Sequence, residues 1–372
     1  MLDQIRSGRN LPVPDFWRGT VEDVDQALSG VTCGEVLSLR KSAGGCQLRA
    51  VAYGKQSPLH RTANLNSAFG ASVPRAYVAK EKRQPSLMLV GGTHGSEMEG
   101  IVGLVNLIHV MESGCDLLGR SWGNLRALAE GVRLTIVPCL NPDGRARVRL
   151  KSYVGETAKT YRYWMQGTHA DGTLYSWPEV KEFHPIQDVG FLGGYFNDDH
   201  INPMHDDFFT NPCAEVLSLM EFADSEAPDL VVLLHSAADS PFHFCSIAHL
   251  PSAHQEAIYR LSGRVASRMA EQQLPFRALP GPQLQQKGYS EQFNLPRALH
   301  HHCGAATLTI ESCAGIEADQ AELELEWQQI LDGHFILFEE LLTGVKADFR
   351  KYAQPFLDDS LGRPSHAEVS DK

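Results

Sequence analysis

The sequence lacks the features that would direct its 372 residues to a membrane, a disulfide scaffold or a nucleic acid. It contains no apolar run of about 18 residues, the length that a transmembrane helix requires. Its eight cysteines include no CxxC pair, so we expect buried free thiols. The 45 acidic residues outnumber the 33 basic ones and give a formal net charge of −12. Binding to nucleic acid is therefore disfavoured, because it needs a concentrated basic face.

Signals for targeting and for repeats are also missing. The first residues do not show the charged-then-apolar pattern of a signal peptide, and no internal repeat or linker divides the chain. We therefore expect a soluble, cytoplasmic protein with a single domain over residues 1–350 and a polar tail over residues 351–372. Its partner would be a small substrate, with no nucleic acid and no membrane, and the sequence does not indicate an oligomeric state.

Strand and helix patterns alternate along the chain. Residues 34–39 and 47–53 read as a hairpin, and four short apolar runs follow at 86–90, 132–137, 229–234 and 307–310. Helical spacing of apolar residues is found at 101–111, 255–272 and 322–345, whereas 145–211 reads as one long loop. Uninterrupted apolar strands that alternate with helices predict an α/β sandwich around a mostly parallel or mixed sheet.

Polar side chains follow each of the four apolar strands at the point where the strand ends. These are His94 and Glu97, then residues 141–144, then His235, and finally Glu311. Ligands of open α/β sheets bind at the carboxyl ends of the strands. The sequence therefore predicts that these side chains converge at one edge of the sheet.

The residue types fit a catalytic zinc ion, which takes three ligands from His, Glu or Asp and keeps one position open for water. His94, Glu97 and His235 would be the ligands, and Glu311 would be the general base. Each residue alone has an ordinary alternative, since HxxE occurs by chance in helices, a lone histidine is often a core residue and a glutamate can cap a segment. Their combination at strand ends favours the metal.

These residues resemble the motifs of the M14 zinc carboxypeptidases. The segment 93–97 is similar to the family's HxxE motif, 141–144 to its Asn-Pro-Asp-Gly, 229–236 to its strand ending in His-Ser, and 309–311 to its strand with the catalytic glutamate. The resemblance covers roughly residues 30–345. It implies a three-layer α/β/α sandwich with a mixed, largely eight-stranded sheet and a single Zn²⁺ ion held by His94, Glu97 and His235. Glu311 would then activate water and pass the proton to the leaving amine.

The substrate side departs from the family pattern. Many members carry an Asn-Arg pair whose arginine binds the substrate carboxylate, but here Asn197 is followed by Asp198, which would repel it. Arg145 and Arg147, in the one basic run of the chain, are the nearest replacements, and Arg145 is also our candidate for polarising the scissile carbonyl. Tyr289 lies where the family keeps a mobile tyrosine. We therefore expect Arg145 to be catalytic and the other four residues to bind substrate.

Alternatives remain open at this point. The leading interpretation is a metallohydrolase acting on a peptide or peptide-like amide. The second is an N-acyl amino acid deacylase of the aspartoacylase and succinylglutamate desuccinylase type, and the third is an inactive binding protein that keeps the fold. A serine hydrolase is disfavoured because no GxSxG elbow is present. The histidines at 300–302 read as a loop, and the acidic clusters at 198–200 and 205–207 as pocket lining or a solvated loop.

Overall fold

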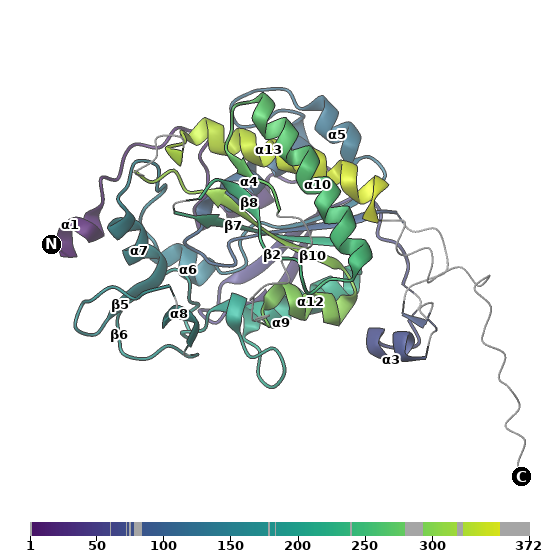
Figure 1. The fold of residues 1–372 in the computed structure, drawn as a ribbon, viewed down its shortest axis with the longest axis horizontal. Helices are drawn as coiled ribbons and strands as arrows, with labels where there is room; N and C mark the ends of the chain where they lie inside the picture. The colour runs from purple at the N-terminus through teal and green to yellow at the C-terminus, as the bar shows by residue number, and fades with distance from the viewer. Residues whose placement is uncertain are drawn as a thin grey trace, which may run out of the picture.

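A computed structural model describes residues 2–349, apart from residues 60, 72, 74–75, 78–83, 178, 183, 239, 280–292 and 318–322. Tyr289 and the polar tail at 351–372 lie outside the described residues. The described part contains an eight-stranded mixed sheet and a separate two-stranded ribbon. Helices cover the large sheet (Figure 1).

The eight strands lie in the order β1-β2-β4-β3-β7-β10-β8-β9 across the large sheet. Their bounds are β1 Glu35–Lys41, β2 Gln47–Tyr53, β3 Ser86–Gly91, β4 Arg133–Val137, β7 Leu230–Ala237, β8 Phe242–Phe244, β9 Phe276–Arg277 and β10 Ala306–Cys313. The central strands β4, β3, β7 and β10 run parallel, whereas β1 with β2, β2 with β4 and β10 with β8 are antiparallel. The predicted hairpin and the four apolar strands are confirmed.

Alternate residues of each central strand pack into two different cores, because successive side chains of a strand point to opposite faces. Leu87 and Leu89 of β3 belong to the core that includes residues of α4 (Met98–Ser113), α5 (Gly123–Ala129), α10 (Ser252–Glu271) and α13 (Trp327–Ala347). Met88 and Val90 belong to the core with α9 (Ala214–Glu226) and α12 (Leu295–Cys303). The fold is thus the predicted three-layer α/β/α sandwich (Figure 1).

The segment that the sequence suggested as one long loop, 145–211, contains secondary structure. It holds α7 Ala158–Gln166, α8 Glu179–Glu182, a 3-10 helix Pro203–His205, and the strands β5 Gly167–His169 and β6 Val189–Leu192, which pair antiparallel. Thr157 caps α7 by accepting a hydrogen bond from the backbone N–H of Thr160, and Tyr161 and Trp164 enter a third apolar core. Elements this short carry too few turns to reveal a periodicity.

The interpretation of residues 300–302 as a loop is wrong, because the three histidines lie in the last turn of α12. This helix has a proline in its first turn and ends at Gly304, which has a φ of 75°, the left-handed conformation that suits glycine. Leu295, Leu299 and Cys303 bury its apolar face. The histidines occupy a more polar part of the same helix, so they hide its periodicity in the sequence.

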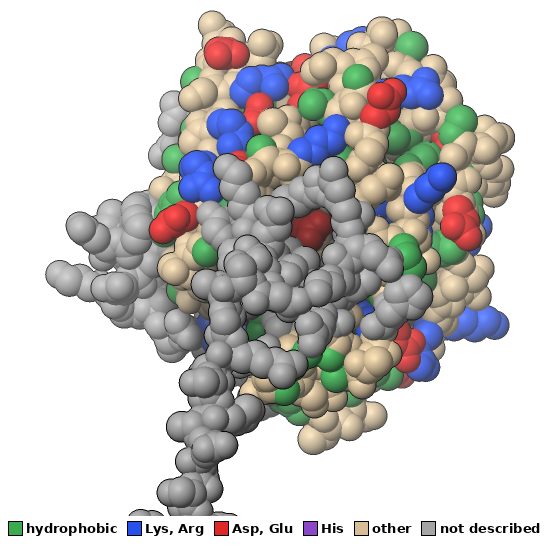
Figure 2. Space-filling model, turned by 90° about the vertical axis from the view of Figure 1, so that its right-hand side faces the viewer, with side chains coloured by type: hydrophobic (Ala, Val, Ile, Leu, Met, Phe, Trp, Pro, Cys, Tyr) green, Lys and Arg blue, Asp and Glu red, His purple; other side chains and the backbone are tan. Residues whose placement is uncertain are grey.

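The remaining elements are α1 Leu2–Ser7, α2 Val21–Ser29, α3 Leu65–Gly70 and α6 Pro142–Arg147. All eight cysteines are unpaired, as the sequence predicts, but only four of them are buried and Cys33 is exposed, so the expectation of buried thiols is wrong for the others. On the face in Figure 2, basic side chains are interspersed with acidic ones and do not form a stripe of the kind that tracks a phosphate backbone. No helix in the described ranges combines the length and the apolar character needed to span a bilayer.

Candidate metal centre

Two adjacent parallel strands and one helix start bring the predicted ligands together. His94 follows the end of β3, and Glu97 is the N-cap residue of α4, where its side chain makes no capping hydrogen bond. His235 lies on β7, whose Leu234 is in register with Gly91 of β3. All three side chains are buried. The parallel register therefore sets the third ligand opposite the loop that carries the first two.

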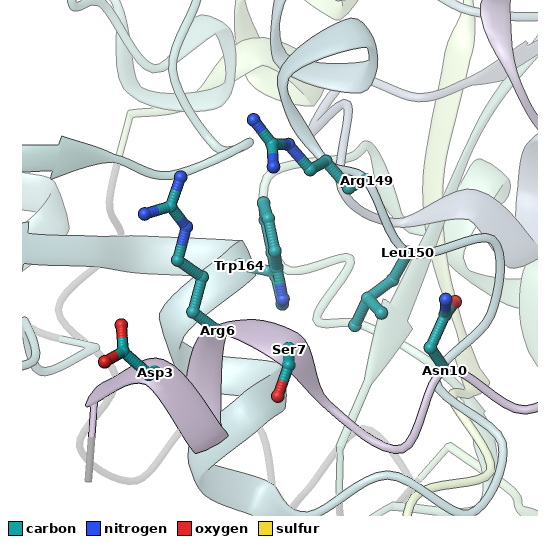
Figure 3. A pocket seen from close by; sticks show the side chains of 7 residues that line it. All are labelled: Asp3, Arg6, Ser7, Asn10, Arg149, Leu150 and Trp164. Carbon is teal, nitrogen blue, oxygen red and sulfur yellow. The ribbon is translucent and has the colours of Figure 1, made fainter.

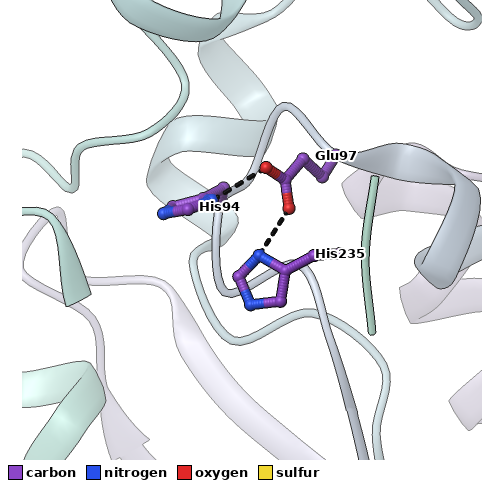
Figure 4. A group of neighbouring side chains, drawn as sticks. All are labelled: His94, Glu97 and His235. Atoms are coloured by element: carbon purple, nitrogen blue, oxygen red, sulfur yellow. Dashed lines mark hydrogen bonds and ion pairs between the residues drawn. The ribbon is translucent and has the colours of Figure 1, made fainter. Parts of the chain in front are cut away.

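The three side chains meet through their ring nitrogens and one carboxylate (Figure 4). The Nδ1 of His94 is 2.8 Å from Oε1 of Glu97, and the Nδ1 of His235 is 2.7 Å from Oε2 of the same carboxylate. One ligand atom from each residue lies within 4.8 Å of the others, and no second group of three such residues is found in the described part of the chain. The two imidazole rings are 4.9 Å apart and nearly perpendicular.

The electrostatics of this group favour an ionised carboxylate. Burial alone would raise the pKa of Glu97, but the neighbouring His94 and His235 outweigh it and hold that pKa below its ordinary value. Burial would likewise lower the pKa of His235, and the contact with Glu97 raises it instead. The centre therefore holds one negative charge between two imidazole donors, a set of ligands that suits a divalent cation of the zinc type.

Outer contacts fix the ring of His94. Its Nε2 is 3.0 Å from Oδ1 of Asn202, so an Nε2–H donor leaves Nδ1 free of its proton for a metal. The ring of Tyr195 stacks on the imidazole of His94, with ring centroids 4.0 Å apart and an interplanar angle of 24°. These contacts constrain both the tautomer and the orientation of the ring. Two nitrogens and a carboxylate oxygen, supported in this way, fit a catalytic zinc site.

Glu311 stands beside this group on β10, in register with His235 of β7. Its Oε1 is 3.9 Å from the Sγ of Cys245, whereas its Oε2 is buried and has no hydrogen-bond partner among the described residues. Burial and the nearby negative charge of Glu97 raise the pKa of Glu311 to about 7, although His235 lowers it. A carboxyl group with a pKa near neutral can both accept and return a proton.

A cavity of about 1330 Å³ opens onto these residues, and His94, Glu97, His235 and Glu311 all belong to its wall. The segment 158–205 forms part of the opposite wall through α7 and α8. The wall is mostly formed by polar and aromatic groups, among them Tyr161, Trp177 and Tyr195. A space of this size can hold a peptide of a few residues.

Arg145, the predicted catalytic arginine, is placed elsewhere. Its guanidinium is buried and donates to three backbone carbonyls, those of Gly19 at 2.7 Å, Val148 at 3.1 Å and Leu150 at 2.8 Å. Arg145 is not among the residues that line the cavity. In this arrangement its hydrogen bonds connect the segment before α2 to the segment after α6.

The predicted substrate-binding residues also lie outside the cavity wall, as far as the structure describes them. Arg147 donates to the carbonyls of Gly193 and Phe196 and pairs with Asp198 at 2.5 Å. Asn197 is buried and donates to Oε2 of Glu215 at 2.8 Å. The cation and the aspartate that we expected to face a substrate thus neutralise each other.

Sequence reasoning missed three residues that contact the centre: Asn202, Tyr195 and Cys245. The positions of Asn202 and Tyr195 depend on how the segment 158–211 folds back over the sheet. The position of Cys245 depends on the pairing of β8 with β10. For Asn202 and Tyr195 the sequence offers only a weak signal, the richness of 145–211 in polar and aromatic residues. Cys245 lies outside that segment. His205 of the second acidic cluster lines the cavity, as the pocket interpretation anticipated. Asp206 instead accepts a hydrogen bond from the backbone N–H of Cys213, the N-cap residue of α9.

A second, smaller cavity of about 270 Å³ lies between α1 and α7 (Figure 3). Arg6, Arg149 and Trp164 line it together with Asp3 and three further residues. Both arginines are exposed. Its lining holds no histidine or cysteine, so it offers nothing comparable to the ligand set of the larger cavity.

Comparison with known proteins agrees with this geometry. The sequence model of the peptidase M14 family, described as zinc carboxypeptidase, matches residues 33–236, more than half of the chain. No curated protein matches the chain. Among solved structures, the metallo-carboxypeptidase of Burkholderia cenocepacia has a TM-score of 0.53 at 14% identity, over 86% of this chain and 67% of its own.

Two further structures are similar. The metallo-carboxypeptidase of Pseudomonas aeruginosa, in complex with (2-guanidinoethylmercapto)succinic acid, has a TM-score of 0.52 at 15% identity, over 87% of this chain and 68% of its own. Bovine thrombin-activatable fibrinolysis inhibitor, in complex with tick carboxypeptidase inhibitor, has a TM-score of 0.53 at 9% identity, over 90% and 99%. At these identities the likeness concerns the fold.

Proposed function

Because the chain belongs to the zinc carboxypeptidase family, we propose that it is a zinc-dependent hydrolase that cleaves a peptide or peptide-like amide bond. One observation carries this proposal: a buried carboxylate flanked by two imidazole nitrogens faces the same cavity as a separate glutamate, Glu311. His94, Glu97 and His235 would hold one zinc ion. When bound there, zinc would lower the pKa of water and polarise the scissile carbonyl.

The protein's own residues would supply the proton transfers. Glu311 accepts a proton from the attacking water as the new C–O bond forms, and it returns that proton to the amide nitrogen as the C–N bond breaks. The thiol of Cys245 donates to Oε1 of Glu311 and so leaves Oε2 as the acceptor. Asn202 and Tyr195 would keep His94 oriented throughout, because Asn202 contacts Nε2 and Tyr195 stacks on the face of the ring, so that neither contact occupies Nδ1.

We assign Arg145 a structural role in this proposal, in place of the catalytic one that the sequence suggested. Its guanidinium already satisfies three buried carbonyls, and moving it into the cavity would leave them without a donor. Arg147 is engaged in the same way by two carbonyls and Asp198. Recognition of a substrate carboxylate therefore falls to cations of the cavity wall.

A second candidate, an N-acyl amino acid deacylase, would also need a cation for the free carboxylate of its substrate, so the engagement of Arg145 and Arg147 does not distinguish the two candidates. The cavity volume of about 1330 Å³ favours the peptide, since an N-acyl amino acid would fill only a small part of it.

The test is hydrolysis by the zinc-loaded protein of three matched sets: free peptides, C-terminally blocked peptides and N-acyl amino acids. Release of the terminal residue from free peptides, lost in Glu311→Gln with zinc retained, is the expected result. Cleavage confined to N-acyl amino acids would favour the deacylase. Absence of zinc from the purified protein, or full activity in Glu311→Gln, would contradict the proposal.

A further inference from the structure

Cations outnumber carboxylates in the wall of the catalytic cavity. The carboxylates are Glu97 and Glu311. The cations come from α7, α8, β9 and α12, and they are Arg162, Lys181, Arg277 and Arg297. The chain as a whole has a net charge of −12, so this excess is not a reflection of its composition. A cleft with walls of one charge sign concentrates ligands of the opposite sign.

Two of these cations are not neutralised by any carboxylate in the described ranges. Arg162 donates from Nη2 to the backbone carbonyl of Tyr175 at 2.7 Å, and Arg277 donates from Nη2 to the hydroxyl of Ser240 at 3.3 Å. A guanidinium has five N–H donors, so these contacts leave most of its donors and its full charge available.

Cross-strand register links Arg277 to the proposed general base, because Glu311 is in register with His243 of β8 and His243 is in register with Arg277 of β9. Lys181 lines the same cavity from α8. Cys245, whose Sγ is 3.9 Å from Oε1 of Glu311, interacts electrostatically with both cations. Glu311 would return its proton to the leaving amine, so groups around it contact the residue that leaves. The two cations therefore belong to the side of the cavity that holds the leaving residue.

The ammonium group of Lys181 is further constrained by Trp177, over whose ring it sits at 3.2 Å from the centroid. Such a cation–π contact limits the positions that a flexible lysine can adopt. Trp177 is itself 49% exposed and lines the cavity, so it forms part of the rim beside this charge. The wall thus presents one restrained ammonium in addition to the guanidinium of Arg277.

We propose that Lys181 and Arg277 form a subsite for an acidic side chain, so that the preferred substrate is a peptide that ends in glutamate or aspartate. A terminal residue of this kind carries two carboxylates, its own α-carboxylate and that of the side chain, and the wall offers cations for both. This inference rests on the proposed function, because it takes Glu311 to mark the leaving residue.

The experiment compares N-acylated dipeptides that differ only in the last residue, glutamate or the isosteric glutamine. We expect the zinc-loaded protein to hydrolyse the glutamate peptide with a kcat/KM at least about tenfold higher, the effect of one well-placed charge pair. Lys181→Gln and Arg277→Gln should each bring this ratio close to one. The matched control is Lys159→Gln, a change of an exposed lysine on α7 that does not line the cavity.

Binding separates the failure of this inference from the failure of the proposed function. Calorimetric titration of zinc-loaded Glu311→Gln with the same two peptides measures their affinities without turnover. If neither peptide is hydrolysed by the wild type but the glutamate peptide binds more tightly, the acidic subsite stands and the proposed reaction fails. Equal affinities, or equal kcat/KM for the two peptides, would overturn the subsite.

Discussion

His235 and Glu311 are register partners on the adjacent parallel strands β7 and β10. One proposed metal ligand and the proposed base are thus set side by side by backbone hydrogen bonds of the central sheet. A functional group on a rigid strand keeps its position better than one on a loop. His94 and Glu97, in contrast, sit in the turn between β3 and α4 and depend on contacts with Asn202 and His235 for their orientation.

Replacing Glu311 with glutamine should remove the proton acceptor while preserving shape. We expect kcat to fall by roughly 10² to 10⁴, the usual size of general acid–base catalysis, with zinc content unchanged. Steady-state kinetics and metal analysis of the same preparation measure both. Glu256→Gln, on the exposed part of α10, is the control and should behave as the wild type. A kcat within a factor of two in Glu311→Gln would exclude this residue as the base.

Replacing His235 with alanine should abolish stoichiometric zinc binding, because it removes one of three ligands and leaves Glu97 without that partner. Wild type should contain one zinc ion per chain, and at a free zinc concentration 100 times Kd the metal should stabilise it by about 2.7 kcal/mol. Elemental analysis and denaturation with and without a chelator test this. His301→Ala, which changes the exposed member of the histidine run of α12, should keep its zinc, and loss of zinc there would point to a different site.

The affinity for an acidic substrate should depend on pH through Lys181. Burial lowers the pKa of this lysine to about 8, against a smaller opposite effect of Cys245. His205, which lines the same cavity, has its own pKa lowered by burial and by the charge of Lys181, and stays neutral. The ammonium is charged below pH 8 and loses its charge as the pH rises through that value. KM for the glutamate peptide should therefore increase above about pH 8, and this increase should disappear in Lys181→Gln.

Replacing Arg145 with methionine should mainly affect stability. The change keeps an apolar stem but leaves three buried carbonyls without their donor, and each unpaired group costs about 1–3 kcal/mol. We expect the free energy of unfolding to fall by at least ~3 kcal/mol in urea denaturation. Arg149→Met, four residues further along the same basic run and exposed, is the matched control. A stable Arg145→Met protein that had lost its catalytic rate would restore the arginine to the reaction.

The structure brings together His94, Glu97 and His235, as the sequence predicted, because much of the physics that positions them is local, and their role as metal ligands stays a prediction. Continuous apolar strands reveal a covered sheet, and polar residues directly after such strands must lie at its edge. His94 and Glu97 follow β3 in this way, whereas His235 and Glu311 lie within β7 and β10, two residues before each strand ends. The α/β pattern predicted that the strand ends converge, whereas the adjacency of β7 and β10 and the register that aligns His235 with Glu311 are long-range features that only the structure shows.

Substrate-side residues could not be predicted in the same way. Lys181 and Arg277 are 96 residues apart in the numbering, and only the fold of the long segment after α6 and the addition of β9 to the sheet edge bring them to one cavity. Arg145 was predicted to be catalytic because it follows a strand. The sequence does not reveal that its guanidinium donates to the carbonyl of Gly19, more than a hundred residues earlier.

The amide of Asn202 has a consequence for the electronic character of the centre. A carboxylate in its place would push electron density through the imidazole of His94 and weaken the electrophile that the ligands hold, whereas a neutral amide donates little. Glu97 is then the single anion among the three candidate ligands. A centre loaded with a divalent cation would therefore keep a net positive charge. The asparagine would thus tune the Lewis acidity of a bound zinc ion through the ring of His94, without being a ligand itself.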